Sequence, residues 1–163
     1  MTLAEILCAP GAHFSCEIFP PKEFAGIEDA KTVVRRIAAL RPAYISVTYG
    51  AAGRTPQFTR ELAEAVQDAG VPALAHITCI NDPVDKVDGV LDGLAAAGVR
   101  NVLALRGDIP PGASFPGEDH FHHANELIAA IKKRGGFCVG AACYPEGHPE
   151  APGKDFDLDT LKM

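Results

Sequence analysis

Short apolar runs alternate with amphipathic segments along the whole chain, and this alternation constrains the fold more than any other feature. Each run has the length of a strand, and the segments between the runs carry apolar residues at helical spacing. The pattern predicts strands at 14–19, 43–48, 73–78, 101–105 and 137–142 and helices at 27–40, 55–70, 82–98 and 123–134, with another helix beginning at 157. Single helices between successive strands indicate βαβ units, a parallel sheet and an α/β fold.

Two α/β architectures fit this order, a doubly wound open sheet and part of a (β/α)8 barrel of the TIM type. Neither common glycine-rich nucleotide loop is present. Successive strand residues point to opposite faces, and the set that we expect to pack on helices comprises Phe14, Cys16, Ile18, Ile45, Val47, Ala73, Ala75, Ile77, Leu103, Leu105, Val139, Ala141 and Cys143. On the fourth strand, Val102 and Ala104 then share the other face with Arg106. The barrel fits better, and the 163 residues would form a single domain (1–163) holding about its first five β/α units.

Composition excludes several classes of partner. The net charge is −6 with both signs mixed, which argues against nucleic acid or an anionic membrane surface. No apolar run approaches the roughly 20 residues of a membrane span, and no signal peptide is readable. The five cysteines form no C-x-x-C pair, so we expect them to be reduced and the protein to be cytoplasmic.

Polar side chains follow the carboxyl ends of the predicted strands, where barrel enzymes place their active sites. They are Glu17, Thr48, His76, Arg106, Asp108 and Tyr144. A carboxyl group enclosed at the carboxyl ends of the strands of a barrel is desolvated, which raises its pKa. This suits Glu17 to act as a general acid. Asp108 lies beside the Arg106 cation at a turn and is expected to ionise more readily. The carboxyl groups of Glu17 and Asp108 would therefore have different roles.

These residues also have purely structural interpretations. Glu17 could be half of a structural ion pair, and a lone His76 is more often a hydrogen-bonded core residue than a catalyst. His120, His122 and His123 could chelate a metal, but their spacing is a weak metal signature. We expect a solvated loop there and no metal site.

Five motifs resemble the 5,10-methylenetetrahydrofolate reductase family in order and spacing. They are Ser15-Cys-Glu-Ile-Phe-Pro-Pro-Lys22, Ser46-Val-Thr-Tyr-Gly-Ala51, Ala75-His-Ile-Thr-Cys79, Ala104-Leu-Arg-Gly-Asp-Ile-Pro-Pro-Gly112 and Ala142-Cys-Tyr-Pro-Glu-Gly-His-Pro-Glu150. The resemblance implies a flavoprotein barrel in which FAD takes a hydride from NADH or NADPH. The reduced flavin then passes it to methylenetetrahydrofolate, giving 5-methyltetrahydrofolate for methionine biosynthesis.

The resemblance also implies a role for individual residues. Glu17 corresponds to the general acid that protonates the N10 nitrogen of the folate and so opens its five-membered ring to an iminium. Asp108 corresponds to the carboxylate that contacts both the flavin and the pterin and stabilises the cation. Thr48 corresponds to a contact on the nicotinamide side. The other cofactor-binding positions are Tyr49, Ala51, His76, Arg106, Gly107, Ala124, Tyr144, His148, Ala151 and Asp157.

The family's last three strands are expected to lie outside this sequence, together with its glutamine and arginine contacts to folate. An open sheet exposes two edges and an apolar inner face, so association into a homo-oligomer or with a second half is expected. Two other hypotheses therefore stay open. One is an inactive fragment or half-barrel interaction module that needs a second half. The other is a flavin-binding protein without folate chemistry.

Overall fold

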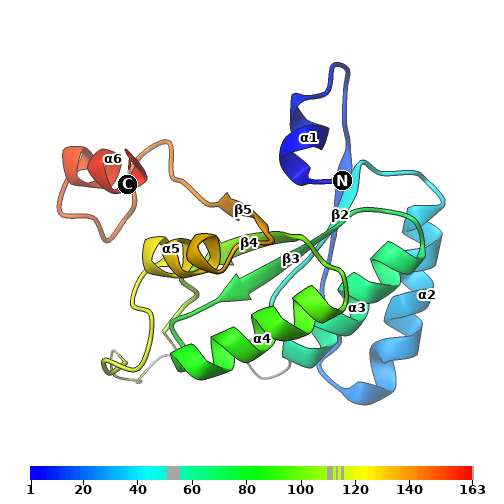
Figure 1. Cartoon of the computed structure of the whole chain (residues 1–163), viewed down its shortest axis with the longest axis horizontal. Coiled ribbons are helices and arrows are strands. Elements are labelled where there is room, and N and C mark those ends of the chain that lie inside the picture. Colours follow the sequence, from blue (N-terminus) through cyan, green and yellow to red (C-terminus); the bar gives the residue numbers. More distant parts are fainter. Residues whose placement is uncertain (51–55, 110–111, 113, 115, 163) are drawn as a thin grey trace.

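Five parallel strands form one sheet in the order in which they occur in the sequence (Figure 1). The computed structural model describes residues 1–50, 56–109, 112, 114 and 116–162. The strands are β1 (Ser15–Ile18), β2 (Tyr44–Val47), β3 (Ala73–Thr78), β4 (Asn101–Leu105) and β5 (Cys138–Ala141). Doubly wound sheets reverse their strand order at a switch point, whereas this order runs in one direction. The fold is thus α/β with the arrangement of a partial (β/α)8 barrel.

The helices that connect these strands agree with the sequence pattern. They are α2 (Ile27–Ala38), α3 (Pro56–Asp68), α4 (Val84–Ala96) and α5 (Ala124–Arg134). Gly70 and Gly98 follow α3 and α4 with φ of +79° and +75°, the left-handed conformation that terminates helices without strain. Thr55, the predicted first position of the helix at 55–70, lies outside the described residues.

Other elements differ from the prediction. A short helix, α1 (Leu3–Cys8), begins at a capping box in which Thr2 and Glu5 bond each other's backbone N–H, and a 3₁₀ turn, η1 (Phe24–Gly26), precedes α2. The last helix, α6 (Lys154–Lys162), begins before the predicted position 157. The predicted helix begins at Asp82, but Pro83 occupies the N-cap position of α4 and the Asp82 side chain bonds Tyr49 instead.

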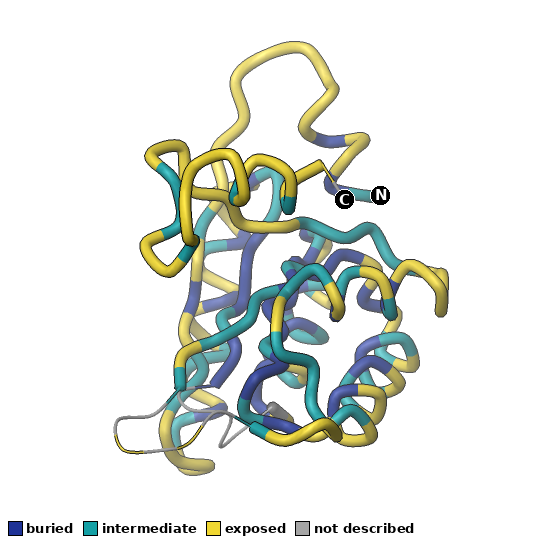
Figure 2. The backbone as a smooth tube through the Cα atoms, turned by 90° about the vertical axis from the view of Figure 1, so that its left-hand side faces the viewer, coloured by how far each residue is buried: buried dark blue, intermediate teal, exposed yellow. Residues whose placement is uncertain are grey.

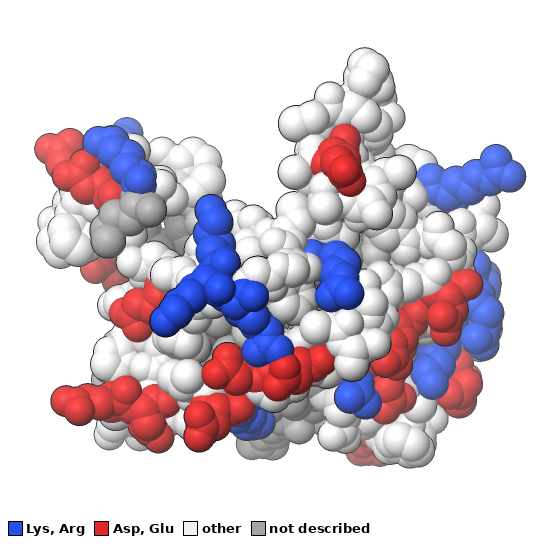
Figure 3. Space-filling model, viewed as in Figure 1, with Lys and Arg blue, Asp and Glu red and all other residues white. Residues whose placement is uncertain are grey.

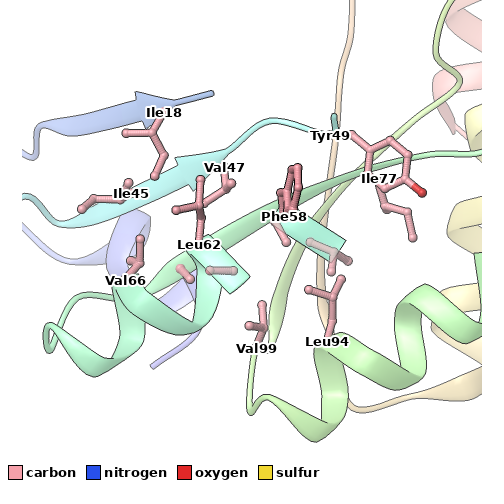
Figure 4. Close-up of a cluster of buried hydrophobic side chains, with 14 of the residues drawn as sticks. Ile18, Ile45, Val47, Tyr49, Phe58, Leu62, Val66, Ile77, Leu94 and Val99 are labelled. Carbon is pink, nitrogen blue, oxygen red and sulfur yellow. The ribbon is translucent and has the colours of Figure 1, made fainter. Parts of the chain in front are cut away.

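The core lies between one face of the sheet and the helices α2, α3, α4 and α5. Figure 4 shows side chains from β1, β2 and β3 meeting those of α3 and α4, and Figure 2 shows buried positions concentrated where sheet and helices meet. On β2 and β3, the residues predicted to face the helices do so. Phe14 was also expected in this core, but it is 52% exposed.

The face assignment of the fourth strand was wrong. Val102 and Ala104 are buried against the helices, at 0% and 1% exposure. Leu103 pairs with His76 in the parallel register, so Leu103 and Leu105 lie on the opposite, inner face of the sheet. The prediction took its face from Arg106 by alternation, but Arg106 follows the end of β4 in a turn and does not report the pleat of the strand.

Helix α1 lies on the inner face, across the sheet from α2, α3 and α4 (Figure 1). Leu3 and Ile6 are its buried residues. The Leu3 backbone N–H donates to Asn101 Oδ1 at 2.8 Å, and Asn101 Nδ2 donates to the Ala73 carbonyl at 3.1 Å. A buried amide on β4 thus fixes this helix over the amino-terminal ends of β3 and β4.

The sheet has two edges, because β1 pairs only with β2 and β5 pairs only with β4 among the described residues. Helix α6 has no buried residue, and Phe156 on it is 60% exposed. Figure 3 shows charges of both signs over the helical layer and a hollow between the parts that carry α1 and α6. Within the described ranges, no helix is long and apolar enough to cross a membrane.

Candidate active site

Glu17 lies at the centre of a polar group on the inner face of β1, β2 and β3. Ser46 pairs with Glu17 in the register of β1 and β2, and the Ser46 hydroxyl donates to Glu17 Oε2 at 3.2 Å. His76 Nε2 from β3 lies 3.6 Å from the same carboxylate oxygen. Three adjacent strands therefore bring a carboxylate, a hydroxyl and an imidazole to one point.

The solvent exposure of this group differs between its members. The His76 side chain is only 11% exposed, and its burial lowers its pKa although the Glu17 carboxylate opposes the shift. The Glu17 side chain is 47% exposed. The enclosure of Glu17 that the sequence predicted is therefore not provided by the described residues.

The Glu17 charge should be measurable through His76. In Glu17→Gln the charge that favours the imidazolium is lost while burial remains, so we expect the pKa of His76 to fall below its wild-type value. A pH titration of the His76 ring by NMR measures this shift. An unchanged or higher pKa in the Gln variant would contradict the coupling.

The same burial predicts acid sensitivity. Because the pKa of His76 is lower in the folded protein than its ordinary value of 6.5, the unfolded chain binds more protons as the pH falls below about that value. The contribution of His76 to stability is therefore complete above this pH and is lost as the pH falls through the folded-state pKa. Urea unfolding of the wild type and of His76→Asn across this range measures the difference.

Arg106 and Glu150 form a second group, after the end of β4. The guanidinium contacts Glu150 through both terminal nitrogens, with Nη2 3.1 Å from Oε1, and its Nε donates to the Gly107 carbonyl at 3.2 Å. This contact raises the pKa of Arg106 and lowers that of Glu150. Asp108 and Tyr144 also lie within electrostatic range of the guanidinium.

Arg106 and Asp108 lie in the turn after β4. Their position was predicted from strand alternation, but it is this turn that places them. The Arg106 carbonyl accepts the backbone N–H groups of Cys79 and Ile80, which joins the turn to the end of β3. Gly107 has a φ of +85°, in the left-handed region that favours glycine. Asp108 is exposed, and its carbonyl accepts from Asn81 Nδ2 at 2.9 Å.

The loop after β5 carries the next predicted residues and is internally bonded. Tyr144 contacts His148 edge to face, with ring centroids 5.0 Å apart. The His148 backbone N–H donates to Asp157 Oδ2 at 3.0 Å, and the Ala151 N–H donates to the His148 carbonyl at 3.0 Å. These contacts hold the four predicted positions together beside Arg106, three of them in the loop and Asp157 on α6.

Tyr49 lies under the strand ends and is buried. Its hydroxyl donates to Asp82 Oδ2 at 3.2 Å, and Lys86 bonds the other oxygen of this 3% exposed carboxylate. Burial, reinforced by the Asp82 charge, raises the pKa of Tyr49. Thr48 uses both backbone groups, donating to the Ile18 carbonyl and accepting from the Thr59 hydroxyl.

The two remaining predicted cofactor positions are Ala51 and Ala124. Ala51 lies outside the described residues. Ala124 is the first residue of α5, and the amide oxygen of the neighbouring Asn125 is buried without a hydrogen-bond partner in the described chain.

The histidine-rich loop makes local contacts. His120 Nδ1 lies 2.8 Å from Asp119, and His122 Nε2 lies 3.0 Å from the Gly117 carbonyl. No cluster of His, Cys, Asp or Glu with the arrangement of a metal site occurs in the described part of the chain. All five cysteines are free thiols, and burial raises the pKa of Cys79 to about 12.

The predicted residues therefore gather into separate groups. Within residues 1–50, 56–109 and 116–162, no hydrogen bond or ion pair joins Glu17 to Asp108 or to Arg106. Sequence reasoning missed two residues that hold these groups, Ser46 and Glu150. Strand alternation did signal Ser46, which shares a face with Thr48, whereas nothing local signalled the pairing of Glu150.

Known proteins are similar to the chain over nearly all of its length. A sequence model of the family described as methylenetetrahydrofolate reductase matches residues 3–163. Methylenetetrahydrofolate reductase 2 of Schizosaccharomyces pombe is 38% identical over 159 residues, which cover 93% of this chain and 24% of that protein. Methylenetetrahydrofolate reductase (NADH) 1 of Zea mays is 39% identical over 143 residues, covering 85% and 24%. The 5,10-methylenetetrahydrofolate reductase of Escherichia coli is 34% identical over 151 residues, covering 92% and 50%. The chain thus spans between a quarter and a half of the length of these relatives.

Proposed function

The chain belongs to the methylenetetrahydrofolate reductase family, and we propose that it supplies the amino-terminal part of a flavin-dependent barrel that reduces 5,10-methylenetetrahydrofolate to 5-methyltetrahydrofolate. NADH or NADPH is the hydride donor. The observation that carries the proposal is the Glu17 group, in which a carboxylate on an inner strand face is bonded by Ser46 and flanked by His76. Residues 1–163 act as a single domain in this proposal.

The side chains that follow the strand ends fit FAD, which has an anionic diphosphate and an aromatic ring system. Arg106 is a bidentate cation suited to a phosphoryl group. Tyr144 and His148 supply aromatic rings, and Asn125 supplies an orphaned buried acceptor at the start of α5. When bound, FAD would accept a hydride from the nicotinamide and pass it to the folate.

The protein's own residues divide the remaining work. Glu17 donates a proton to the N10 nitrogen of the folate, and the Ser46 hydroxyl fixes the orientation of the carboxyl group. Burial lowers the pKa of His76, which disfavours a positive charge beside the acid. Asp108 supplies the negative charge that stabilises the substrate cation as the ring opens. The Thr48 hydroxyl has no hydrogen bond within the described residues, and it is available to contact the nicotinamide.

Cofactor binding is tested by the visible spectrum of the purified chain after gel filtration with FAD. We expect bound flavin to co-elute with the protein and to be bleached by NADH or NADPH. Arg106→Gln should lose most of the flavin, because its charge would pair with the diphosphate. A colourless protein peak would contradict the proposal that this chain binds FAD by itself.

A second candidate function is an interaction module that builds a complete site only with further strands. The two sheet edges and the exposed α6 favour it, because open edges and apolar surfaces pair with other chains. This candidate predicts a defined homo-oligomer, or a complex with a separately encoded half, on gel filtration. A well-folded monomer that retains FAD would count against it.

A further inference from the structure

Glu150 pairs with both terminal nitrogens of the Arg106 guanidinium. The third nitrogen, Nε, donates to the Gly107 carbonyl. Asp108 adds a second negative charge nearby. An anionic ligand approaching Arg106 therefore meets a cation whose charge is already balanced.

The two partners differ in their freedom to leave. The Arg106 side chain is 20% exposed and is held by the turn after β4, whereas the Glu150 side chain is 64% exposed. Exposed carboxylates are well hydrated and contribute little to stability through an ion pair. Glu150 can therefore exchange Arg106 for water at small cost, while the guanidinium stays in position.

The backbone on either side of Glu150 is tied down. The His148 N–H is bonded to Asp157, the Ala151 N–H is bonded to the His148 carbonyl, and the Glu150 N–H donates to His148 Nδ1 at 3.1 Å. Release of Arg106 thus requires only a rotation of the Glu150 side chain, and the loop keeps its shape.

We propose that Glu150 is a displaceable counter-ion that sets the affinity of this site for a phosphate-bearing ligand. It occupies Arg106 until two oxygens of a phosphoryl group take the same bidentate position. The inference rests on the proposed function, in which the diphosphate of FAD is that group. Because the ligand binds only the fraction of molecules in which Arg106 is released, the pair weakens the apparent affinity by that fraction.

The test compares FAD affinity between the wild-type chain of residues 1–163 and Glu150→Gln, with quenching of flavin fluorescence as the signal. The Gln side chain keeps the size and removes the charge, so we expect a dissociation constant lower by about three- to tenfold. Glu146→Gln makes the same charge change at an exposed carboxylate of the same loop and should leave the constant unchanged. An unchanged or weaker affinity in Glu150→Gln would overturn the proposal, because Glu150 would then not compete with the ligand.

A second probe separates this inference from FAD binding. Inorganic pyrophosphate is titrated into the same variants, with the Arg106 Nε–H signal followed by NMR and Arg106→Gln identifying that signal. If no variant binds FAD, the proposed function of the isolated chain fails. Tighter pyrophosphate binding by Glu150→Gln would still support the counter-ion, and equal or absent binding would refute it.

Discussion

Under the proposed function, replacement of Glu17 by Gln should reduce the rate of methylenetetrahydrofolate reduction by about 10²- to 10⁴-fold, the usual contribution of a positioned general acid. Gln preserves the shape of the side chain and an oxygen that can accept from Ser46, but it has no proton of suitable acidity to donate. Reduction of the bound flavin by NADH requires no proton at the folate and should proceed at nearly the wild-type rate. Rapid-mixing absorbance of the flavin, first with NADH and then with folate, measures the two half-reactions separately.

A matched control for this variant is Glu23→Gln. Glu23 is an exposed carboxylate at the start of η1, and its replacement changes the net charge equally. It should leave both half-reactions intact. If Glu17→Gln turned over folate at the wild-type rate, Glu17 would be a structural carboxylate paired with Ser46 and His76 and another group would supply the proton.

The fold was predictable because its signals are local. Helical spacing and the terminating glycines located α2, α3, α4 and α5. The polar residues Ser15 and Glu17 fixed the faces of β1, since the alternation there had a polar marker. On β4 the same rule was referenced to Arg106, which lies in the turn after the strand, so it assigned Val102 to the wrong side. The Thr2–Glu5 capping box was a local signal for α1 that the prediction did not use.

The contacts of the site were less predictable, because they join distant parts of the chain. Glu150 pairs with Arg106 across 44 positions, and Asp82 accepts from Tyr49 across 33. An Asp before a Pro has the local signature of a helix cap, and nothing nearby reveals a buried tyrosine as its partner. The sequence could therefore nominate residues at the strand ends, while the sheet and its turns decide which of them touch.

Replacement of Gly107 by Ala should destabilise the chain by about 2–4 kcal/mol, because two costs combine at this turn. The φ of +85° is unfavourable for any residue with a Cβ. The added Cβ would also lie 3.0 Å from Thr78 Cβ and 3.3 Å from its Cγ2, so the end of β3 would have to shift. Arg106 and Asp108 flank this glycine, and the variant should therefore also lose FAD affinity.

The matched variant Gly70→Ala separates the two costs. Gly70 has a similar φ of +79° after α3, but its Cβ would meet no atom within 4 Å. It should lose only the backbone contribution, about 1–2 kcal/mol, and keep its FAD affinity. Urea unfolding of both variants measures the difference, and the excess for Gly107→Ala is the cost of contact with Thr78. Equal losses in the two variants would mean that the turn after β4 is free to move away from β3, and Gly107 would then not be what holds Arg106 and Asp108 at the edge of the site.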